Sequence, residues 1–169
     1  MPQPLRQGFS LIELLVTLAV LTILISSTMP ALAEFIERQR ASAYVRQFSQ
    51  HLAYARVAAT SSNLAVQLCP YEDGECAADW QHLPLQLNLL YPDPGEKKLL
   101  REIAPVYAAH RLHYNRSAVT FRRDGSLNGF ENGTFYYCPQ TQYQWHYRMT
   151  LNQAGRGRLT ELAEPCPTN

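Results

Sequence analysis

The N-terminal part of the sequence is short of residues that interrupt helices. The stretch Phe9–Thr60 has no glycine, and Pro30 is its single proline. We therefore expect one helix of about 50 residues, roughly 75 Å long and kinked near Pro30. After Ala31, apolar residues recur at helical spacing with charged residues between them, which predicts a second half that packs an apolar stripe on a sheet. The residues Ser61–Asn63 mark the expected end of the helix.

Charge is equally scarce at the start of this helix. The run Phe9–Met29 is apolar or small and holds one charged residue, Glu13. A bilayer core takes about 20 apolar residues as a helix, so the run can span a membrane or be buried against other apolar helices. A lone carboxylate is costly in lipid and usually has a partner. A secretory signal peptide would have its small-residue cleavage site after the apolar run, whereas here Gly8 precedes it, behind a short leader that carries Arg6.

Motifs for catalysis and for metal binding are missing. The sequence has no nucleophile elbow, and the stretch Gly155–Arg158 (GRGR) lacks the lysine and the serine or threonine of a P-loop. The cysteines lack the C-x2-C pairs of common zinc sites. His110, His113 and His146 could suggest a metal or a base, but His110 and His113 lack a convincing third ligand. We expect a protein that is not an enzyme, with no catalytic residue, no metal site and no cofactor.

Acidic and basic residues are unevenly distributed, although the formal net charge is only +1. The segment Glu72–Glu102 has seven acidic residues against three basic ones, whereas Ile103–Thr160 has seven arginines, no lysine and two acidic residues. The arginines are Arg111, Arg116, Arg122, Arg123, Arg148, Arg156 and Arg158. An arginine-only excess favours a carboxylate or phosphate partner, because a guanidinium can bind either through two hydrogen bonds. The alternative is a solvated face with internal ion pairs.

Short runs with strand character follow the helix. They are Leu64–Leu68, Leu85–Tyr91, Lys98–Ile103, Arg111–Tyr114, Ala118–Arg122, Gly133–Cys138, Gln144–Leu151 and Arg158–Leu162. We expect the segment 69–76 (CPYEDGEC) to be a loop that turns at Asp73-Gly74, and Asp124-Gly125 to form another turn. Several short strands separated by turns indicate an antiparallel sheet, so the fold class is expected to be α+β.

The N-terminal pattern resembles the class III signal of type IV pilins and pseudopilins. The resemblance implies that prepilin peptidase cuts after Gly8 and that Phe9 is then N-methylated. The apolar segment would first anchor the protein in the membrane and later pack in the filament core. Glu13 matches a glutamate thought to pair with the terminal amine of a neighbouring subunit, and a paired buried carboxylate costs far less than a lone one. The alternative is an ordinary N-terminal membrane anchor.

Four further blocks resemble the GspH/FimT group of pseudopilins and minor pilins. They are Val66–Gln81 (VQLCPYEDGECAADWQ), Val119–Gly129 (VTFRRDGSLNG), Gly133–Pro139 (GTFYYCP) and Leu151–Leu159 (LNQAGRGRL). The resemblance implies a type IV pilin-like fold, a long N-terminal helix packed on a C-terminal antiparallel β-rich domain. It implies a leader at 1–8, a transmembrane or filament-core half helix at 9–30, an amphipathic half at 31–62 and a β-rich domain at 63–169. After Trp80 the sequence departs from the group, which often has a glycine-containing apolar strand there.

The four cysteines are Cys69, Cys76, Cys138 and Cys166. An even number in a protein outside the cytosol indicates disulfides, and three pairings are possible. We favour Cys69–Cys76, which would close a small loop, together with Cys138–Cys166, which would tie the tail to a strand.

The GRGR stretch resembles the DNA-binding motif of FimT-type minor pilins, which take up DNA for natural transformation. In an extended segment Arg156 and Arg158 would share a face, and each guanidinium could bind a phosphate. Gly155 and Gly157 would let a backbone approach closely or bend freely. Such contacts bind DNA without reading its sequence and weaken with salt. The alternative is a glycine turn with two solvated arginines.

Other residues could extend this site. Arg148, Arg122 and Arg123 are the further candidates, and Arg111 and Arg116 could widen a basic surface, although nothing in the sequence places them beside Arg156. Aromatic side chains could stack on single-stranded bases, but such residues are more often sheet core. The aromatic candidates are Tyr136, Tyr137, Tyr143, Trp145 and Tyr147.

The first functional hypothesis is a minor type IV pilin that binds extracellular DNA for uptake. The alternative is a structural minor pilin or type II secretion pseudopilin that primes assembly or caps a filament tip. The implied partners are other pilin subunits, prepilin peptidase, DNA and the inner membrane of a bacterium. The expected location is that membrane, as a single-pass protein with its C-terminal domain in the periplasm, and then the pilus near its tip.

Overall fold

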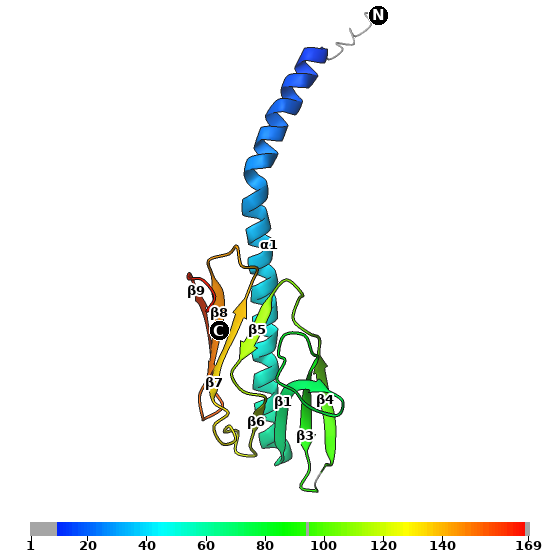
Figure 1. Ribbon diagram of the computed structural model, residues 1–169, viewed down its shortest axis with the longest axis vertical. Helices are drawn as coiled ribbons and strands as arrows, with labels where there is room; N and C mark the ends of the chain where they lie inside the picture. Colours follow the sequence, from blue (N-terminus) through cyan, green and yellow to red (C-terminus); the bar gives the residue numbers. More distant parts are fainter. Residues whose placement is uncertain (1–9, 94, 168–169) are drawn as a thin grey trace, which may run out of the picture. The chain divides into compact units, whose positions relative to one another are not determined.

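The computed structural model describes residues 10–93 and 95–167, which form one long helix followed by short strands (Figure 1). The helix α1 covers Leu11–Ser62. The strands are β1 (Ala65–Glu72), β2 (Glu75–Cys76), β3 (Leu85–Leu90), β4 (Lys97–Ile103), β5 (Arg111–Tyr114), β6 (Val119–Phe121), β7 (Gly133–Cys138), β8 (His146–Leu151) and β9 (Gly157–Leu162). The chain divides into two units, the residues up to Gln39 and those from Arg40 onward.

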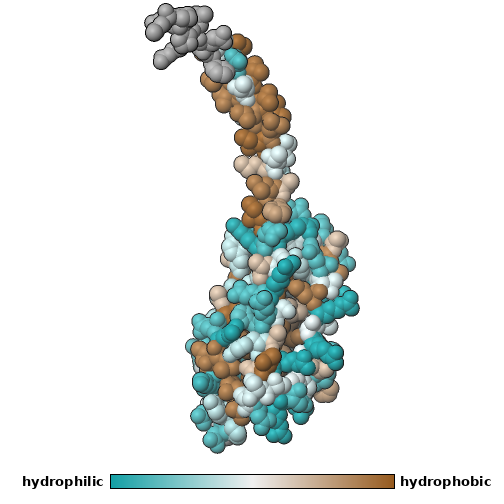
Figure 2. Space-filling model, turned by 180° about the vertical axis from the view of Figure 1, so that it is seen from behind, coloured by the Kyte–Doolittle hydropathy of each residue, from teal (hydrophilic) through white to brown (hydrophobic). Residues whose placement is uncertain are grey.

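In the first unit, α1 exposes an apolar surface (Figure 2). Its hydroxyl groups form hydrogen bonds within the helix. The hydroxyls of Thr17, Thr22 and Ser26 donate to backbone carbonyls three residues earlier, at 2.8 to 2.9 Å. These donors are therefore satisfied without water, as an apolar environment requires. Pro30 lies inside the helix, which continues on both sides of it. Among the described residues, α1 is the one helix long and apolar enough to cross a membrane.

In the second unit, α1 packs through a single stripe of small and apolar side chains. The stripe consists of Ala41, Val45, Phe48, Leu52, Ala55 and Ala59, all at most 4% exposed. Their spacing of three or four residues places them on one face of the helix. Phe48 lies edge-on against Phe135 with 5.0 Å between ring centroids, and Tyr44 stacks on Tyr137 at 4.9 Å. The expected packing of an apolar stripe on a sheet is confirmed.

Two antiparallel sheets make up the rest of this unit (Figure 1). The five-stranded sheet has the order β2-β1-β3-β4, and β6 also pairs with β1. The four-stranded sheet has the order β5-β7-β8-β9. Along β8, Tyr147, Met149 and Leu151 are buried, whereas Arg148 and Thr150 are exposed. The four-stranded sheet therefore has an apolar inner face and a polar outer face.

The segment expected to be a loop at 69–76 is instead part of a β-hairpin. β1 continues to Glu72 and pairs with β2, with Tyr71 opposite Cys76 and Glu72 opposite Glu75. Asp73 and Gly74 form the two-residue turn, with φ of 49° and 92°. Two positive φ values are typical of the tight turn that matches the twist of paired strands. The turn was placed correctly, but the loop prediction for its flanks was wrong because both flanks pair as strands.

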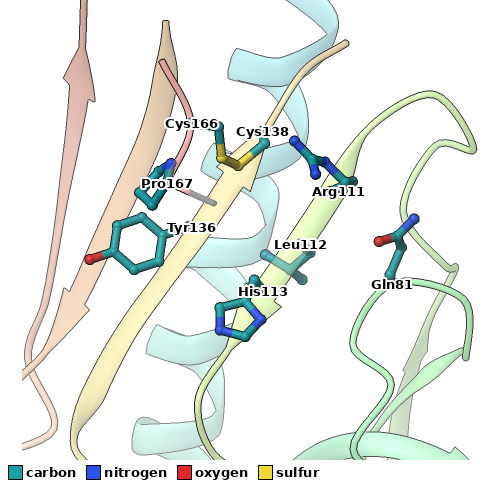
Figure 3. Close-up of a pocket in the computed structure, with 8 residues that line it drawn as sticks. All are labelled: Gln81, Arg111, Leu112, His113, Tyr136, Cys138, Cys166 and Pro167. Atoms are coloured by element: carbon teal, nitrogen blue, oxygen red, sulfur yellow. A yellow bond between two sulfur atoms is a disulfide. The ribbon is translucent and has the colours of Figure 1, made fainter. Parts of the chain in front are cut away.

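The structure contains two disulfides in the β-rich region. Cys69 is bonded to Cys76 beside the β1–β2 hairpin, with 5.5 Å between the Cα atoms. Cys138, at the end of β7, is bonded to Cys166 in the C-terminal tail, with 5.8 Å between the Cα atoms. The second disulfide holds the tail against the outer face of the four-stranded sheet (Figure 3).

Candidate functional site

The GRGR stretch lies where the chain turns from β8 into β9. The backbone N–H of Gly155 donates to the carbonyl of Asn152 at 2.9 Å, and that of Asn152 donates to the carbonyl of Arg156 at 3.1 Å. The side-chain oxygen of Asn152 accepts from the backbone N–H of Arg156 at 2.9 Å. Gly155 has φ of +70°, which favours glycine. The loop is therefore fixed by its own hydrogen bonds, with Arg156 at its end and Arg158 two residues later in β9.

Gly155 also lets two loops touch. A Cβ at this position would lie 2.2 Å from the carbonyl oxygen of Gly125, in the turn that follows β6. The same two loops exchange hydrogen bonds, because Leu127 N–H donates to the carbonyl of Gln153 at 2.9 Å and the Gln153 amide donates to the carbonyl of Leu127 at 2.7 Å. Gly157 is less constrained, since its Cβ would meet only the flexible end of Leu151, at 3.3 Å, and a more distant Met149.

Three arginines surround one hollow on the outer face of the four-stranded sheet. The hollow has a volume of about 420 Å³, and we call it the basic hollow; it is lined by Arg148, Thr150, Asn152, Arg156, Gly157, Arg158 and Thr160. Strand register produces this arrangement, because Arg148 lies opposite Thr160 and Thr150 lies opposite Arg158. Arg148, which the sequence could not place, thus lies beside the two arginines of the GRGR stretch.

No acidic residue among those described in the structure lies on the walls of the basic hollow. The side chains of Arg148, Arg156 and Arg158 are exposed and make no ion pair with any residue in the described ranges 10–93 and 95–167. Three like charges held on one concave surface, without internal counter-charges, create a local positive potential. The chemistry of this surface suits an anion that can accept several hydrogen bonds at once.

The other candidate arginines do not line the basic hollow. Arg122 and Arg123 are exposed in the turn after β6. Their turn also carries Asp124, whose carboxyl pKa is held below its usual range mainly by hydrogen bonds from Ser126, with a smaller effect of Arg122. Arg116 donates from Nε to the carbonyl of Phe130 at 2.9 Å.

Arg56 is a basic residue near the site that sequence reasoning did not select. Its Nε donates to the carbonyl of Gly125 at 3.1 Å. Together with Arg156 it lines a second hollow, of about 360 Å³, between α1 and the β8–β9 loop. Arg56 is separated from this loop by about a hundred residues of sequence, so no local pattern could have revealed the contact.

Two of the three candidate histidines are buried. His110 shares a hydrogen bond of 2.6 Å between its Nδ1 and the hydroxyl of Tyr137. His146 has its Nδ1 3.1 Å from the carbonyl of Glu164. His113 is exposed on β5. Within the described part of the chain, no group of three or more histidine, cysteine, aspartate or glutamate side chains could hold a metal ion.

The predicted processing and assembly residues lie near the start of the chain. Glu13 is in the first turn of α1 and is exposed. Gly8 and Phe9 lie outside the described residues.

Comparisons with known proteins agree on the kind of molecule. The family model described as type II transport protein GspH matches residues 44–155, and the prokaryotic N-terminal methylation motif matches residues 4–29. Crystal structures of the type IV minor pilin FimU of Pseudomonas aeruginosa are similar in fold. One has 24% identity and a TM-score of 0.60 over 79% of this chain and 96% of that chain. Another crystal form has 22% identity and a TM-score of 0.55, over 77% and 96% of the two chains. No curated protein gives a significant sequence match.

Proposed function

We propose that this chain, which belongs to the GspH family and is a type IV minor pilin or pseudopilin, binds extracellular DNA for uptake in natural transformation. The observation that carries the proposal is the basic hollow, where three arginines converge that make no ion pair within the described part of the chain. Arg156 and Arg158 are its principal DNA-binding residues, and Arg148 completes it. Gly155 and Gly157 are assigned to the same site.

Binding would occur through the phosphate backbone. Each guanidinium can donate two parallel hydrogen bonds to phosphate oxygens. Contacts to phosphate carry no sequence information, so the binding would be nonspecific. Neutralising three phosphates of duplex DNA releases counterions, which gives a slope of about −2.7 in a plot of log affinity against log salt. Arg122 and Arg123 lie on the adjoining turn and would contribute less, because Asp124 is in the same turn.

The N-terminal segment supplies anchoring and assembly. A family member with this methylation motif interacts with other pilins and is processed by prepilin peptidase. For this chain we assign cleavage after Gly8, methylation of Phe9, and pairing of Glu13 with the terminal amine of a neighbouring subunit. The assigned segments are the leader at 1–8, the transmembrane or filament-core half helix at 9–30, the amphipathic half at 31–62 and the β-rich domain at 63–169. The C-terminal domain would lie in the periplasm before assembly and near the pilus tip afterwards. We assign no enzymatic activity.

A titration of the full-length mature protein tests DNA binding directly. The protein is placed in nanodiscs of zwitterionic lipid, and a fluorescent duplex is titrated at several salt concentrations. We expect binding that weakens with salt, and a fall in the salt slope of about 1 for each of Arg156→Gln and Arg158→Gln. The matched control, Arg122→Gln with Arg123→Gln, removes the same charge from outside the basic hollow. Combining Arg156→Gln with Arg158→Gln gives the double variant to compare with this control. Equal losses of DNA affinity in the two double variants would contradict the assigned site. No binding at low salt would contradict the DNA-binding function.

Processing has a separate test. Mass spectrometry of the protein extracted from membranes should show loss of Met1–Gly8 and gain of one methyl group. An intact leader would contradict the assignment of Gly8 and Phe9. Replacing Glu13 with glutamine should leave membrane insertion intact but impair incorporation into filaments, since removing a charge does not hinder a helix in lipid.

A structural role in a filament is the second candidate function. It is favoured by the family description, a type II transport protein, and by the fold of a minor pilin. The phenotype of Arg156→Gln with Arg158→Gln separates the two roles. Lost transformation with normal filaments supports the DNA-uptake role, whereas lost filaments or lost secretion supports the structural one.

A further inference from the structure

The outer face of the four-stranded sheet continues beyond the basic hollow towards β5. Side chains that lie directly opposite one another across strands are neighbours on one face. The register places His113 opposite Tyr136, Tyr136 opposite Arg148, and Arg148 opposite Thr160. One row of side chains therefore crosses all four strands and joins Tyr136 directly to an arginine of the basic hollow.

Tyr136 differs from the other aromatic residues of its region. Tyr137, Trp145 and Tyr147 are buried in the core, and Tyr143 packs against that core. Tyr136 is half-buried and is absent from the core cluster. Its hydroxyl makes no hydrogen bond within the described residues, whereas those of Tyr137 and Tyr147 contact His110 and Glu161. The packing of the core thus does not account for the position of this ring.

The ring of Tyr136 lines a hollow of its own (Figure 3). The hollow has a volume of about 290 Å³, and its other walls include Arg111, His113, Pro167 and the disulfide Cys138–Cys166. This volume is many times the roughly 10 to 15 Å³ that one water molecule needs, so the hollow has room for more than a single ion. His146 lies beside Tyr136, with 6.0 Å between ring centroids and a tilt of 49°. The tail disulfide gives the hollow a fixed rim.

Positive charge stands on both sides of this ring. Arg111 lines the hollow of Tyr136, and Arg148 is its cross-strand neighbour in the basic hollow. They lie on β5 and β8, which are two strand spacings apart, or about 10 Å. Both side chains are exposed. Sites for single-stranded nucleic acid combine a positive groove for the backbone with an aromatic ring on which a base stacks.

We propose that Tyr136 stacks on an unpaired base of single-stranded DNA whose phosphates are held by Arg111 and by the arginines of the basic hollow. This inference rests on the proposed function and adds a preference for DNA with accessible bases. In duplex DNA the faces of the bases are covered by stacking, so a duplex contacts only the arginines. The tyrosine is positioned on a paired strand, so stacking requires little reordering of the protein.

The test compares three DNA ligands of equal length on the full-length protein in zwitterionic nanodiscs. They are oligothymidine, an abasic oligomer with the same phosphates, and a duplex. We expect the protein to bind oligothymidine about tenfold more tightly than the abasic oligomer, as one stacked base would give. Tyr136→Thr keeps a strand-forming residue and should remove this difference while leaving duplex affinity unchanged. Tyr136→Phe keeps the ring and should preserve the difference.

The outcomes separate the inference from the function on which it rests. Equal affinity of the unmodified protein for oligothymidine and the abasic oligomer would overturn the stacking inference, while duplex binding would leave the DNA-binding function standing. No affinity for any of the three ligands would overturn both.

A second measurement avoids variants altogether. Oligomers carrying 5-iodouracil are photo-crosslinked to the unmodified protein, and the crosslinked peptide is identified by mass spectrometry. We expect attachment at Tyr136, and attachment only at other residues would overturn the inference.

Discussion

The two sheets of the C-terminal unit carry similar basic side chains but use them differently. On the five-stranded sheet, the ammonium of Lys97 donates to the carbonyl of Gly74 at 2.6 Å and lies 4.7 Å from the centroid of the Tyr71 ring. The guanidinium of Arg101 lies 3.8 Å from the centroid of the Tyr54 ring. On the four-stranded sheet, Arg148 and Arg158 have no such contact within the described residues.

This difference separates basic residues that stabilise the fold from those available to a ligand. A cation above an aromatic ring contributes about 0.5 to 1 kcal/mol at an exposed site, and it does so only while it stays there. An exposed arginine without partners contributes little to folding, so its position calls for another explanation. The charge distribution along the sequence does not give this distinction, because the distinction depends on the contacts that each basic side chain makes in the fold.

The largest expected effect comes from breaking the contact that joins the two sheets. Gly155, in the β8–β9 loop, touches the carbonyl of Gly125, in the turn after β6. Gly155→Ala would add a clash at 2.2 Å to a strained positive φ, and should lower the free energy of unfolding by about 3 kcal/mol or more. Thermal unfolding followed by circular dichroism measures this loss.

Gly157→Ala is the matched control for that variant. Its Cβ would press on the end of the Leu151 side chain at 3.3 Å, which can move, and its φ is not positive. We expect a change below about 1 kcal/mol, in the range of ordinary substitutions with a small local adjustment. Equal destabilisation by Gly155→Ala and Gly157→Ala would show that the requirement for glycine at position 155 has another cause than its close approach to Gly125.

The second effect concerns the inner face of the four-stranded sheet, where Tyr114 is buried. Burial and the nearby Glu131 carboxylate raise the pKa of Tyr114 to about 12, and its hydroxyl donates to the backbone carbonyl of Glu131. Because the folded pKa exceeds the unfolded value of about 10, this group stabilises the fold below pH 10 and loses that contribution between pH 10 and 12. This difference in pKa between the folded and unfolded states corresponds to about 2 to 3 kcal/mol in the free energy of unfolding.

Tyr114→Phe isolates this contribution. The variant lacks the ionisable hydroxyl. When the pH rises from 10 to 12, the free energy of unfolding should fall in both proteins, but by about 2 kcal/mol less in the variant. Denaturant titrations at the two pH values give both numbers. Parallel losses in the two proteins would show that other groups, and not Tyr114, set the alkaline limit of stability.

Much of the fold could be predicted from periodicity and turn chemistry. The absence of glycine and the helical spacing after Ala31 predicted α1, which ends where Asn63 takes a positive φ. The β1–β2 hairpin was missed because Pro70 and the acidic residues around it are poor strand formers in isolation. Pairing with β3 and β2 overrides that preference, since Pro70 lies opposite Leu85 within the ladder.

The candidate site could be predicted only in part, because its composition depends on strand pairing. A motif was enough to single out Arg156 and Arg158. The place of Arg148 beside them follows from the pairing of β8 with β9, which no local pattern gives. Tyr136 and Tyr137 are adjacent and point to opposite faces, and only the packing of the sheet on α1 decides which one is buried in the core.

The smallest expected effect tests the comparison itself by removing two charges from each sheet in turn. Lys97→Gln with Arg101→Gln should lower the free energy of unfolding by about 1 kcal/mol and leave DNA affinity unchanged. Arg148→Gln with Arg158→Gln removes the same charge, should leave stability unchanged within about 0.5 kcal/mol, and should weaken duplex binding about tenfold. Denaturation and the salt-dependent titration are run on the unmodified protein and on both double variants. Equal losses of DNA affinity in the two double variants would mean that DNA binding responds to net charge alone. The distinction between basic side chains with contacts in the fold and those available to a ligand would then fail. A loss of stability in the first double variant and a loss of DNA affinity in the second would mean that the position of each charge, set by strand register, decides its role.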